Sequence, residues 1–366
     1  MDQNQELCGR YLVSLLSSIL NKKQPQEIPQ ALSFEELFQM AEAHQVSVIV
    51  LAAVEQLTKK PAPALLTKWQ DAKGLYAFIN IAQILELDRL IKSFASEGIS
   101  AVPLKGCLMK SLYPHTEYRQ MGDLDILIQE KDAERARTEM ESLGYHTKFF
   151  GVGHHDYYRR DPFLVVELHR MLFDTKSNLH PLFKNIWERV QPGDKPGNAL
   201  RLSVEDFYLF LIAHFEKHFH NFGSGIRSIM DVAVFLNSCS DSLDWPYIDR
   251  ELIKLGLADF HEAIKQLAMA WFHGEPCSDF ARQLERELFD SGGAYGSRHK
   301  YLDNTAFRLK NTTKLNYILR MIFLPLPQMR ILYPVLHDWS VLYPFFLVHR
   351  LITKRRIGME ELRYIK

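Results

Sequence analysis

Two aspartates, Asp123 and Asp125, stand one residue apart in the otherwise apolar segment MGDLDILIQ. Alternate side chains of a strand share a face, so both carboxylates would project from one surface while Leu124, Ile126 and Ile128 serve the core on the other. An ionised carboxylate beside a core is costly unless a partner compensates its charge. Two hard oxygen ligands this close suit Mg²⁺ (or Mn²⁺), which takes one or two carboxylates with water and substrate phosphates. The pattern predicts a divalent metal bound together with a nucleoside triphosphate.

A third acidic residue follows in the strand-like segment LVVELHR, where Glu167 shares a face with Val165 and His169. Two-metal phosphoryl or nucleotidyl transfer needs a further carboxylate as ligand and as base for the attacking oxygen. We therefore predict that Asp123, Asp125 and Glu167 are the catalytic and metal-binding residues, which requires that they converge on one pocket.

Upstream, Lys105 and Gly106 follow a strand-like run and open a predicted helix. Glycine lets the backbone approach a phosphate, and a helix N-terminus favours an anion. Lys105 and Arg119 could then neutralise a triphosphate. The structural alternatives are a solvated Lys105 and an ion pair of Arg119 with Glu117 or Asp123.

Downstream, Arg227 and Asp231 stand four residues apart in a helical segment. This spacing is typical of a helix-stabilising pair, and the alternative is contact with the base, ribose or phosphate in the cleft. His214 and His218 have the same spacing, which is compatible with zinc, but HFEKH lacks the Glu that follows the first His in the metalloprotease motif.

The sequence indicates a functional role less strongly for the other histidines. His169 is expected to be a core residue or to orient a ligand. The cluster GHHDYY, with His154, His155 and Asp156, could bind a transition metal, but neighbouring residues on a loop converge poorly without further ligands. We expect instead a loop that closes over the nucleotide.

The elements that must position these residues alternate in type along the chain. Helical periodicity covers residues 6–97, with a capping box from Ser33 to Glu36. Strands and helices then alternate over residues 99–172, and the aromatic run FYLFLIAHF after a Pro/Gly linker is expected to be core. We predict an α+β protein: an N-terminal helical segment (1–97), a small mixed α/β core (98–190) and a C-terminal helical domain (199–366).

Composition narrows the class of protein. The 366 residues are 47% hydrophobic and 24% charged, which is typical of an ordinary globular protein. The net charge of zero gives no global attraction to nucleic acid or an anionic membrane. The four cysteines form no CxxC pair, which is typical of a reducing cytoplasm. Neither a signal peptide nor a transmembrane helix is predicted.

One C-terminal segment, WSVLYPFFLVHRLITKRR at residues 339–356, is apolar and then basic. It could be an interfacial membrane helix. A helix packed on its own domain with a solvated basic end is favoured, because Pro344 and His349 interrupt the apolar run.

The segments PLKGCLMKSLYPHTEYRQMGDLDILI and VVELHR resemble the nucleotidyltransferase superfamily of the DNA polymerase β type. The resemblance is closest to a mostly uncharacterised bacterial branch with the order Lys-Gly, Arg, Asp-x-Asp and Glu-x-His. It covers roughly residues 97–172 and extends more loosely to HFEKHF and IRSIMDV.

This resemblance implies that Asp123, Asp125 and Glu167 bind two Mg²⁺ ions and that a nucleoside monophosphate is transferred to a hydroxyl with release of pyrophosphate. Gly106 would belong to the phosphate loop. Most of the superfamily has Gly-Ser at this loop, whereas this chain has Cys107 after the glycine, and a thiol is a weaker donor to phosphate than a hydroxyl.

The expected function is a cytoplasmic, Mg²⁺-dependent nucleotidyltransferase that uses a nucleoside triphosphate. The acceptor hydroxyl stays open between an RNA end, a protein side chain and a small molecule, and zero net charge disfavours a large nucleic-acid footprint. The alternative is a non-catalytic nucleotide- or partner-binding protein on the same scaffold, possibly membrane-peripheral. The residues predicted to bind the nucleotide are Lys105, Gly106, Arg119, Arg227 and Asp231.

Overall fold

A computed structural model describes residues 3–148, 150–193, 200–221, 223–294, 296, 326, 329, 333–336 and 339–349. The chain divides into two compact units, one formed by Met1–Phe219 with Gly223–Gly296 and the other by His220–Phe222 with Ser297–Lys366. The division into segments 1–97, 98–190 and 199–366 remains a prediction.

Two of the N-terminal helices begin or end at residues that the sequence marks as helix termini. The Ser33 hydroxyl accepts from the backbone N–H of Glu36, whose side chain accepts from Ser33, so the predicted capping box is confirmed. The longest helix has a proline in its first turn and ends before Gly98, whose φ of +64° suits a helix C-terminus. These helices are α1 (Gln3–Leu20), α2 (Phe34–Ala43), α3 (Ser47–Val54) and α4 (Pro63–Ser96).

Five strands form one mixed sheet in the order β1-β2-β5-β4-β3. The pair β2–β5 is parallel, and β1–β2, β4–β5 and β3–β4 are antiparallel. With helices before and after this sheet in the chain, the predicted α+β class is confirmed. The strands are β1 (Ala101–Pro103), β2 (Leu124–Ile128), β3 (His146–Thr147), β4 (His155–Arg160) and β5 (Leu164–His169).

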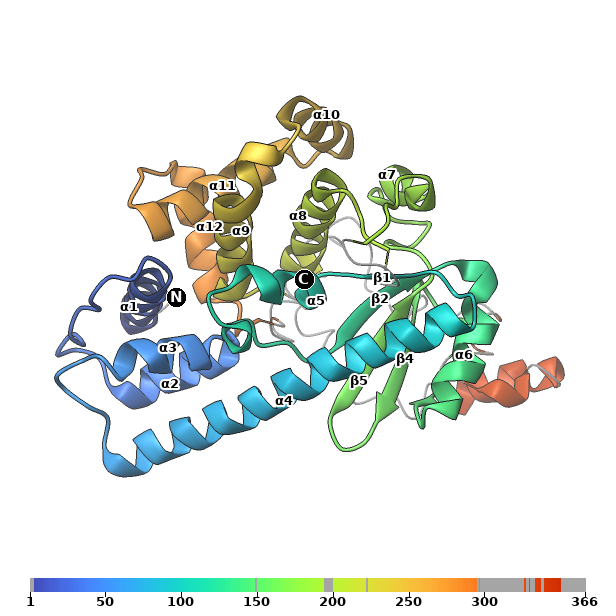
Figure 1. Cartoon of the computed structure of the whole chain (residues 1–366), viewed down its shortest axis with the longest axis horizontal. Coiled ribbons are helices and arrows are strands. Elements are labelled where there is room, and N and C mark those ends of the chain that lie inside the picture. Colours follow the sequence, from blue (N-terminus) through green and yellow to red (C-terminus); the bar gives the residue numbers. More distant parts are fainter. Residues whose placement is uncertain are drawn as a thin grey trace. The chain divides into compact units, whose positions relative to one another are not determined.

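Strands β2 and β5 share one apolar face. Leu124 and Ile126 of β2 are fully buried there, in one cluster with Leu90 and Phe94 of α4 and Met140 of α6 (Ala133–Ser142). Figure 1 shows α4 and α6 running along the sheet. Because alternate residues of a strand point to opposite faces, this packing sends the acidic side chains of β2 and β5 to the other face.

The segment GHHDYY corrects a prediction, because from His155 onward it is a strand and not a loop. Strand β4 forms a hairpin with β5, and Asp156 and Tyr158 are buried while Tyr157 is exposed on the opposite face. Both faces of β4 carry polar groups. Strand β4 therefore lacks the alternation of apolar and polar residues by which a strand is recognised in a sequence.

Helices form most of the rest of the first unit. The rings of Phe207, Phe210 and Phe215 in α8 are buried, which confirms the predicted aromatic core. The remaining helices before residue 297 are α5 (Gly106–Met109), α7 (His180–Phe183), α8 (Val204–Asn221), α9 (Ile226–Cys239), α10 (Trp245–Leu255), α11 (Ala258–His273) and α12 (Asp279–Phe289), with 3₁₀ turns at Lys110–Leu112, Thr116–Tyr118, Glu130–Asp132, Ile186–Glu188 and Ser240–Ser242.

The second unit is described only in part. It contains 3₁₀ turns at Pro334–Leu336 and Ser340–Leu342, and residues 343–349 are helical. The predicted C-terminal helix is thus described as far as residue 349, and residues 350–356 lie outside the described residues. Among the helices that the structure describes, none has the length and apolar character needed to cross a bilayer.

Candidate active site

The sheet brings two acidic residues from distant parts of the chain side by side. In the parallel register of β2 and β5, Asp125 lies directly opposite Glu167, and Leu127 lies opposite His169. One ligand atom from each of Asp125, Glu167 and His169 lies within 4.8 Å of the others. The convergence that the sequence interpretation required is therefore present for this carboxylate pair.

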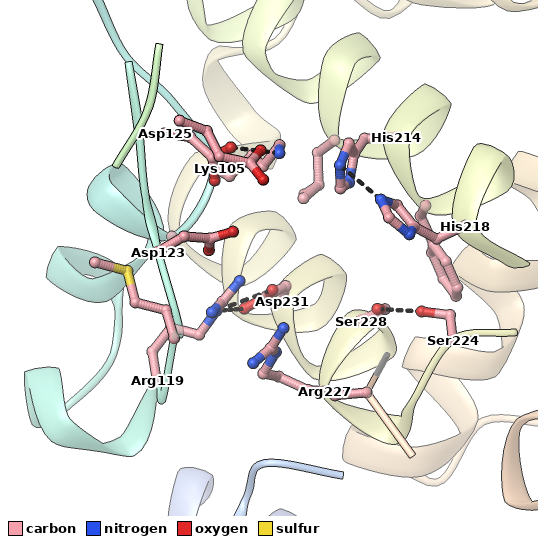
Figure 2. Close-up of a pocket in the computed structure, with 16 residues that line it drawn as sticks. Lys105, Arg119, Asp123, Asp125, His214, His218, Ser224, Arg227, Ser228 and Asp231 are labelled. Carbon is pink, nitrogen blue, oxygen red and sulfur yellow. Dashed lines mark hydrogen bonds and ion pairs between the residues drawn. The ribbon is translucent and has the colours of Figure 1, made fainter. Parts of the chain in front are cut away.

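Asp123 completes the acidic group from the residue before β2. It lines the same cavity as Asp125 (Figure 2), and it makes no hydrogen bond or ion pair with any residue that the structure describes. Burial, together with the charges of Asp125 and Glu167, raises the pKa of Asp123 to about 6. Three carboxylates that repel one another at the edge of a core are an unfavourable arrangement unless a cation joins them.

Asp125 already has two positively polarised neighbours. The Lys105 ammonium lies 2.6 Å from Asp125 Oδ1, and Nε2 of His169 lies 2.7 Å from the same oxygen. Burial favours the neutral acid, but Lys105 and His169 outweigh it and hold the pKa of Asp125 well below its usual value. Asp125 is therefore ionised, and its second oxygen makes no contact of this kind within the described part of the chain.

The turn between β1 and β2 places Lys105 in a strained conformation, with φ +44° and ψ −121°. Strain of this kind clusters at functional sites. At Gly106 a Cβ would lie 2.8 Å from the sulfur of Met121 and 3.3 Å from Nη1 of Arg119, so a larger residue would displace these side chains.

The helix that begins at Gly106 is short. It ends at Met109 and continues as a 3₁₀ turn, so the dipole of a full helix is not available to an anion here. Cys107 is not among the residues that line the cavity, and its Sγ lies 3.7 Å from the Asp125 carbonyl oxygen. Burial raises the pKa of Cys107 to about 12, so it is a neutral thiol bonded to the backbone of β2.

Arg119 is held by a helix far along the chain. Its Nε donates to both carboxylate oxygens of Asp231 in α9, at 2.9 and 3.1 Å, and the Tyr113 hydroxyl donates to Asp231 at 2.6 Å. Sequence reasoning considered Glu117 and Asp123 as partners of Arg119 and missed Asp231. The two walls of the cavity are joined by this buried pair.

Arg227 projects from the first turn of α9 toward the same region (Figure 2). Its Nη1 donates to the Gln120 carbonyl oxygen at 2.8 Å and to the Gln45 side chain. Arg119 Nη1 donates to the same carbonyl oxygen at 2.8 Å. Two guanidinium groups are thus fixed at the border of the cavity, Arg119 from the segment before β2 and Arg227 from α9.

Helix α8 supplies a wall that the sequence interpretation did not assign to the site. His214 and His218 line the cavity, with their Nε2 atoms 3.0 Å apart. Burial lowers the pKa of His218 to about 4 and that of His214 well below its usual value, so both imidazoles are neutral hydrogen-bonding groups. Their four-residue spacing indicated a common face of the helix but not which face meets the cavity.

All eight residues predicted from the sequence to be catalytic, metal-binding or nucleotide-binding line one cavity of about 250 Å³. Their chemical roles remain predictions. They are Lys105, Gly106, Arg119, Asp123, Asp125, Glu167, Arg227 and Asp231, and the lining residues that sequence reasoning did not assign to the site are Met121, Leu211, His214, Phe215, His218, Ser224, Ser228 and Ala294.

The comparison with protein families gives one match, in which residues 30–273 fit a family described as uncharacterised nucleotidyltransferase. The matched range includes every one of the eight predicted site residues. No curated protein and no solved structure matches the chain significantly.

Proposed function

The chain belongs to the uncharacterised nucleotidyltransferase family and is a nucleotidyltransferase, and on that basis we propose that it moves a nucleoside monophosphate from a nucleoside triphosphate to an acceptor hydroxyl and releases pyrophosphate. The observation that carries the proposal is the alignment of Asp125 with Glu167 across β2 and β5, with Asp123 in the same cavity. Lys105, Arg119 and Arg227 bring positive charge to the cavity walls.

The carboxylate group fits Mg²⁺. All three side chains offer hard oxygen atoms, which Mg²⁺ prefers over nitrogen and sulfur. Asp123 has no hydrogen-bond or ion-pair partner among the described residues, and its pKa is raised by burial and by the charges of Asp125 and Glu167, a repulsion that a bound cation would relieve. Asp123, Asp125 and Glu167 would hold the ion, which would neutralise the triphosphate and lower the pKa of the acceptor hydroxyl.

The transfer is a displacement at the α-phosphorus. The acceptor oxygen forms a bond to that phosphorus while the bond to the bridging oxygen of the β-phosphate breaks, and pyrophosphate leaves. Glu167 accepts the proton of the attacking hydroxyl. One of its oxygens lies 3.6 Å from His155 Nε2 and the other 3.5 Å from His169 Nε2, so both imidazoles border the carboxylate.

Lys105 binds the triphosphate through its ammonium group. Its ammonium is paired with Asp125 at 2.6 Å, and the flexible side chain can exchange this partner for a phosphate oxygen when the carboxylates bind a cation. The Gly106 backbone borders the cavity without a side chain in the way, which lets a phosphate approach.

Arg119 and Arg227 are positioned for the charge that develops on the leaving pyrophosphate. Arg119 is fixed by Asp231 and by the Gln120 carbonyl oxygen. Such preorganised donors stabilise a transition state because they need no rearrangement when charge develops. Asp231, which is already bonded to Arg119 and Tyr113, positions Arg119.

The cavity of about 250 Å³ is slightly below the usual range of about 300–1,000 Å³ for small-ligand pockets. It suits the triphosphate, with the nucleoside extending toward solvent. The apolar side chains of Leu211 and Phe215 on α8 border this space and can contact the nucleoside or the acceptor.

Two labels on the same nucleotide test this function. The purified protein is incubated with Mg²⁺ or Mn²⁺, whole-cell extract and each nucleoside triphosphate labelled at the α- or the γ-phosphate. We expect the α label on an acceptor molecule and the γ label in pyrophosphate, and isolation of the labelled acceptor identifies its class. Transfer of the γ label to the acceptor, or no consumption of any nucleotide, would contradict the proposal.

A further inference from the structure

Three histidines meet on the sheet face that carries the carboxylates. His154 directly precedes β4, which begins at His155, and His169 ends β5; His155 and His169 are direct partners in the antiparallel register. One ring nitrogen of each lies within 4.8 Å of the other two. From the sequence, His154 and His155 lacked a third ligand; the β-hairpin provides it.

The spacing of the first two rings matches a metal site. His155 Nδ1 and His154 Nε2 are 3.3 Å apart. Two nitrogen ligands at about 2.0–2.1 Å from one tetrahedral Zn²⁺ ion are separated by about 3.3–3.4 Å. The contact therefore has the separation that a shared ion requires.

The third ring has the hydrogen bond that usually accompanies metal binding. His169 is buried, its Nε2 is bonded to Asp125 at 2.7 Å, and its Nδ1 has no hydrogen-bond partner in the described part of the chain. Histidines that bind metals almost always use one ring nitrogen for the ion and the other for a carboxylate, a carbonyl or water. His169 Nδ1 is thus a buried nitrogen that makes no hydrogen bond within the described residues and is available as a ligand.

From these observations we propose that His154, His155 and His169 form a binding site for a transition-metal ion of the Zn²⁺ class, which adjoins the carboxylate group through His169 but uses imidazole nitrogens in place of the oxygens that suit Mg²⁺. Imidazole nitrogen selects Zn²⁺, Co²⁺ or Ni²⁺ and is a poor ligand for Mg²⁺. The site does not depend on the proposed function, because its ligands and its test involve no nucleotide.

Lys217 of α8 gives the site a built-in competitor. Its ammonium lies 3.2 Å from His154 Nε2, so a bound cation must displace this contact and meets the repulsion of a positive charge. Replacement of Lys217 by an uncharged residue should therefore tighten metal binding, an effect that misfolding cannot produce.

Cobalt provides the test. Metal-free, full-length protein is titrated with Co²⁺ in saturating Mg²⁺ and without nucleotide, and the visible ligand-field absorption is recorded, which is strong for four-coordinate nitrogen sites and weak for six-coordinate oxygen sites. We expect one Co²⁺ per chain and loss of the absorption on addition of Zn²⁺. His154→Ala and His155→Ala should each weaken binding by at least about tenfold, and Lys217→Met should strengthen it by about tenfold.

His146→Ala, which removes an exposed imidazole of β3, is the matched control and should bind Co²⁺ as the unaltered protein does. Far-UV circular dichroism and the thermal midpoint check that each variant is folded. The proposal is overturned if the unaltered protein gives no strong absorption band, if both histidine variants keep its affinity, or if Lys217→Met does not bind more tightly.

Discussion

The Arg119 side chain reaches across 112 residues of sequence to Asp231, and its Nε donates to both oxygens of that carboxylate. Both side chains are almost completely buried, with 7% and 5% of their surface exposed. Tyr113 donates a further hydrogen bond to Asp231. Because Arg119 precedes β2 and Asp231 belongs to α9, this pair fixes the distance between two walls of the cavity.

Removal of Asp231 should therefore be costly. Asp231→Ala leaves the Arg119 guanidinium buried without its carboxylate, and breaking such a pair lowers the free energy of unfolding by about 3–5 kcal/mol. Urea denaturation followed by circular dichroism measures the change. The matched control is Glu141→Ala, which removes the exposed partner of Arg137 at 2.9 Å and should cost less than about 1 kcal/mol. Equal effects of the two substitutions would contradict a structural role for the buried pair.

Gly106→Ala should impair turnover more than stability. The added Cβ would lie 2.8 Å from the Met121 sulfur and 3.3 Å from Arg119 Nη1. The methionine side chain can move, but the turn that carries Lys105 shifts with it. Misplacement by a fraction of an ångström typically lowers the rate by about tenfold to a hundredfold. Steady-state kinetics with the labelled nucleotide measures the loss.

Two further variants test the cause of that loss. Met121→Ala combined with Gly106→Ala opens the space and should restore part of the rate. Gly74→Ala, in the exposed part of α4 with no atom within 4 Å of the new Cβ, should leave turnover unchanged and stabilise the helix by up to about 1 kcal/mol. A double variant as slow as Gly106→Ala alone would mean that the contact with Met121 is not the cause.

The sequence was sufficient to predict the strands in which apolar and polar residues alternate. Alternation in β2 and β5 predicted which of their side chains leave the core, and the unpaired acids on those faces predicted the carboxylate group. The reason is physical: a charge in an apolar strand needs a partner, so Asp123, Asp125 and Glu167 are conspicuous in the sequence.

The site residues and partners that the sequence did not predict are brought together by contacts between distant parts of the chain. Nothing near Arg119 in the sequence points to Asp231, and nothing near His154 points to His169 across the β4–β5 hairpin. Strand β4 itself was missed because polar residues occupy both of its faces. Residues that meet only after the chain has folded, such as His214 beside the cavity, leave no periodic pattern.

Mg²⁺ should stabilise the protein through Asp123. At ten times its dissociation constant the ion adds about 1.4 kcal/mol to the free energy of unfolding, and Asp123→Asn should abolish this gain. Without Mg²⁺ the variant should be at least as stable as the unaltered protein, because it removes both the burial of a charge and the repulsion by Asp125 and Glu167 that together raise the pKa of Asp123. Urea denaturation with and without Mg²⁺ at constant ionic strength measures both effects.

Asp88→Asn is the matched control for this experiment. Asp88 is an exposed acid of α4 paired with Lys92, outside the cavity. Its variant should keep the full response to Mg²⁺. If Mg²⁺ still stabilises Asp123→Asn and no longer stabilises Asp88→Asn, the ion does not bind at the carboxylate group in the cavity.

Acid should destabilise the fold through His44. This imidazole is buried at the end of α2, and its Nδ1 accepts the backbone N–H of Ile226 in the first turn of α9. Burial lowers the pKa of His44 to about 4 from its usual 6.5. The folded state disfavours protonated His44. The stability that neutral His44 contributes is therefore fully present above pH 6.5 and is lost as the pH falls toward 4. A shift of this size corresponds to about 3 kcal/mol.

His44→Asn tests this assignment because an asparagine oxygen can accept the same N–H bond and does not titrate. Denaturation curves of both proteins between pH 7 and pH 4 give the difference in their unfolding free energies at each pH. The other buried histidines are present in both proteins, so their contribution to the pH dependence is the same and drops out of this difference. We expect the two proteins to approach each other in stability as the pH falls, since a protonated His44 would lose the bond to Ile226 and place a positive charge at the N-terminus of α9. Parallel curves would show that another group carries the acid sensitivity.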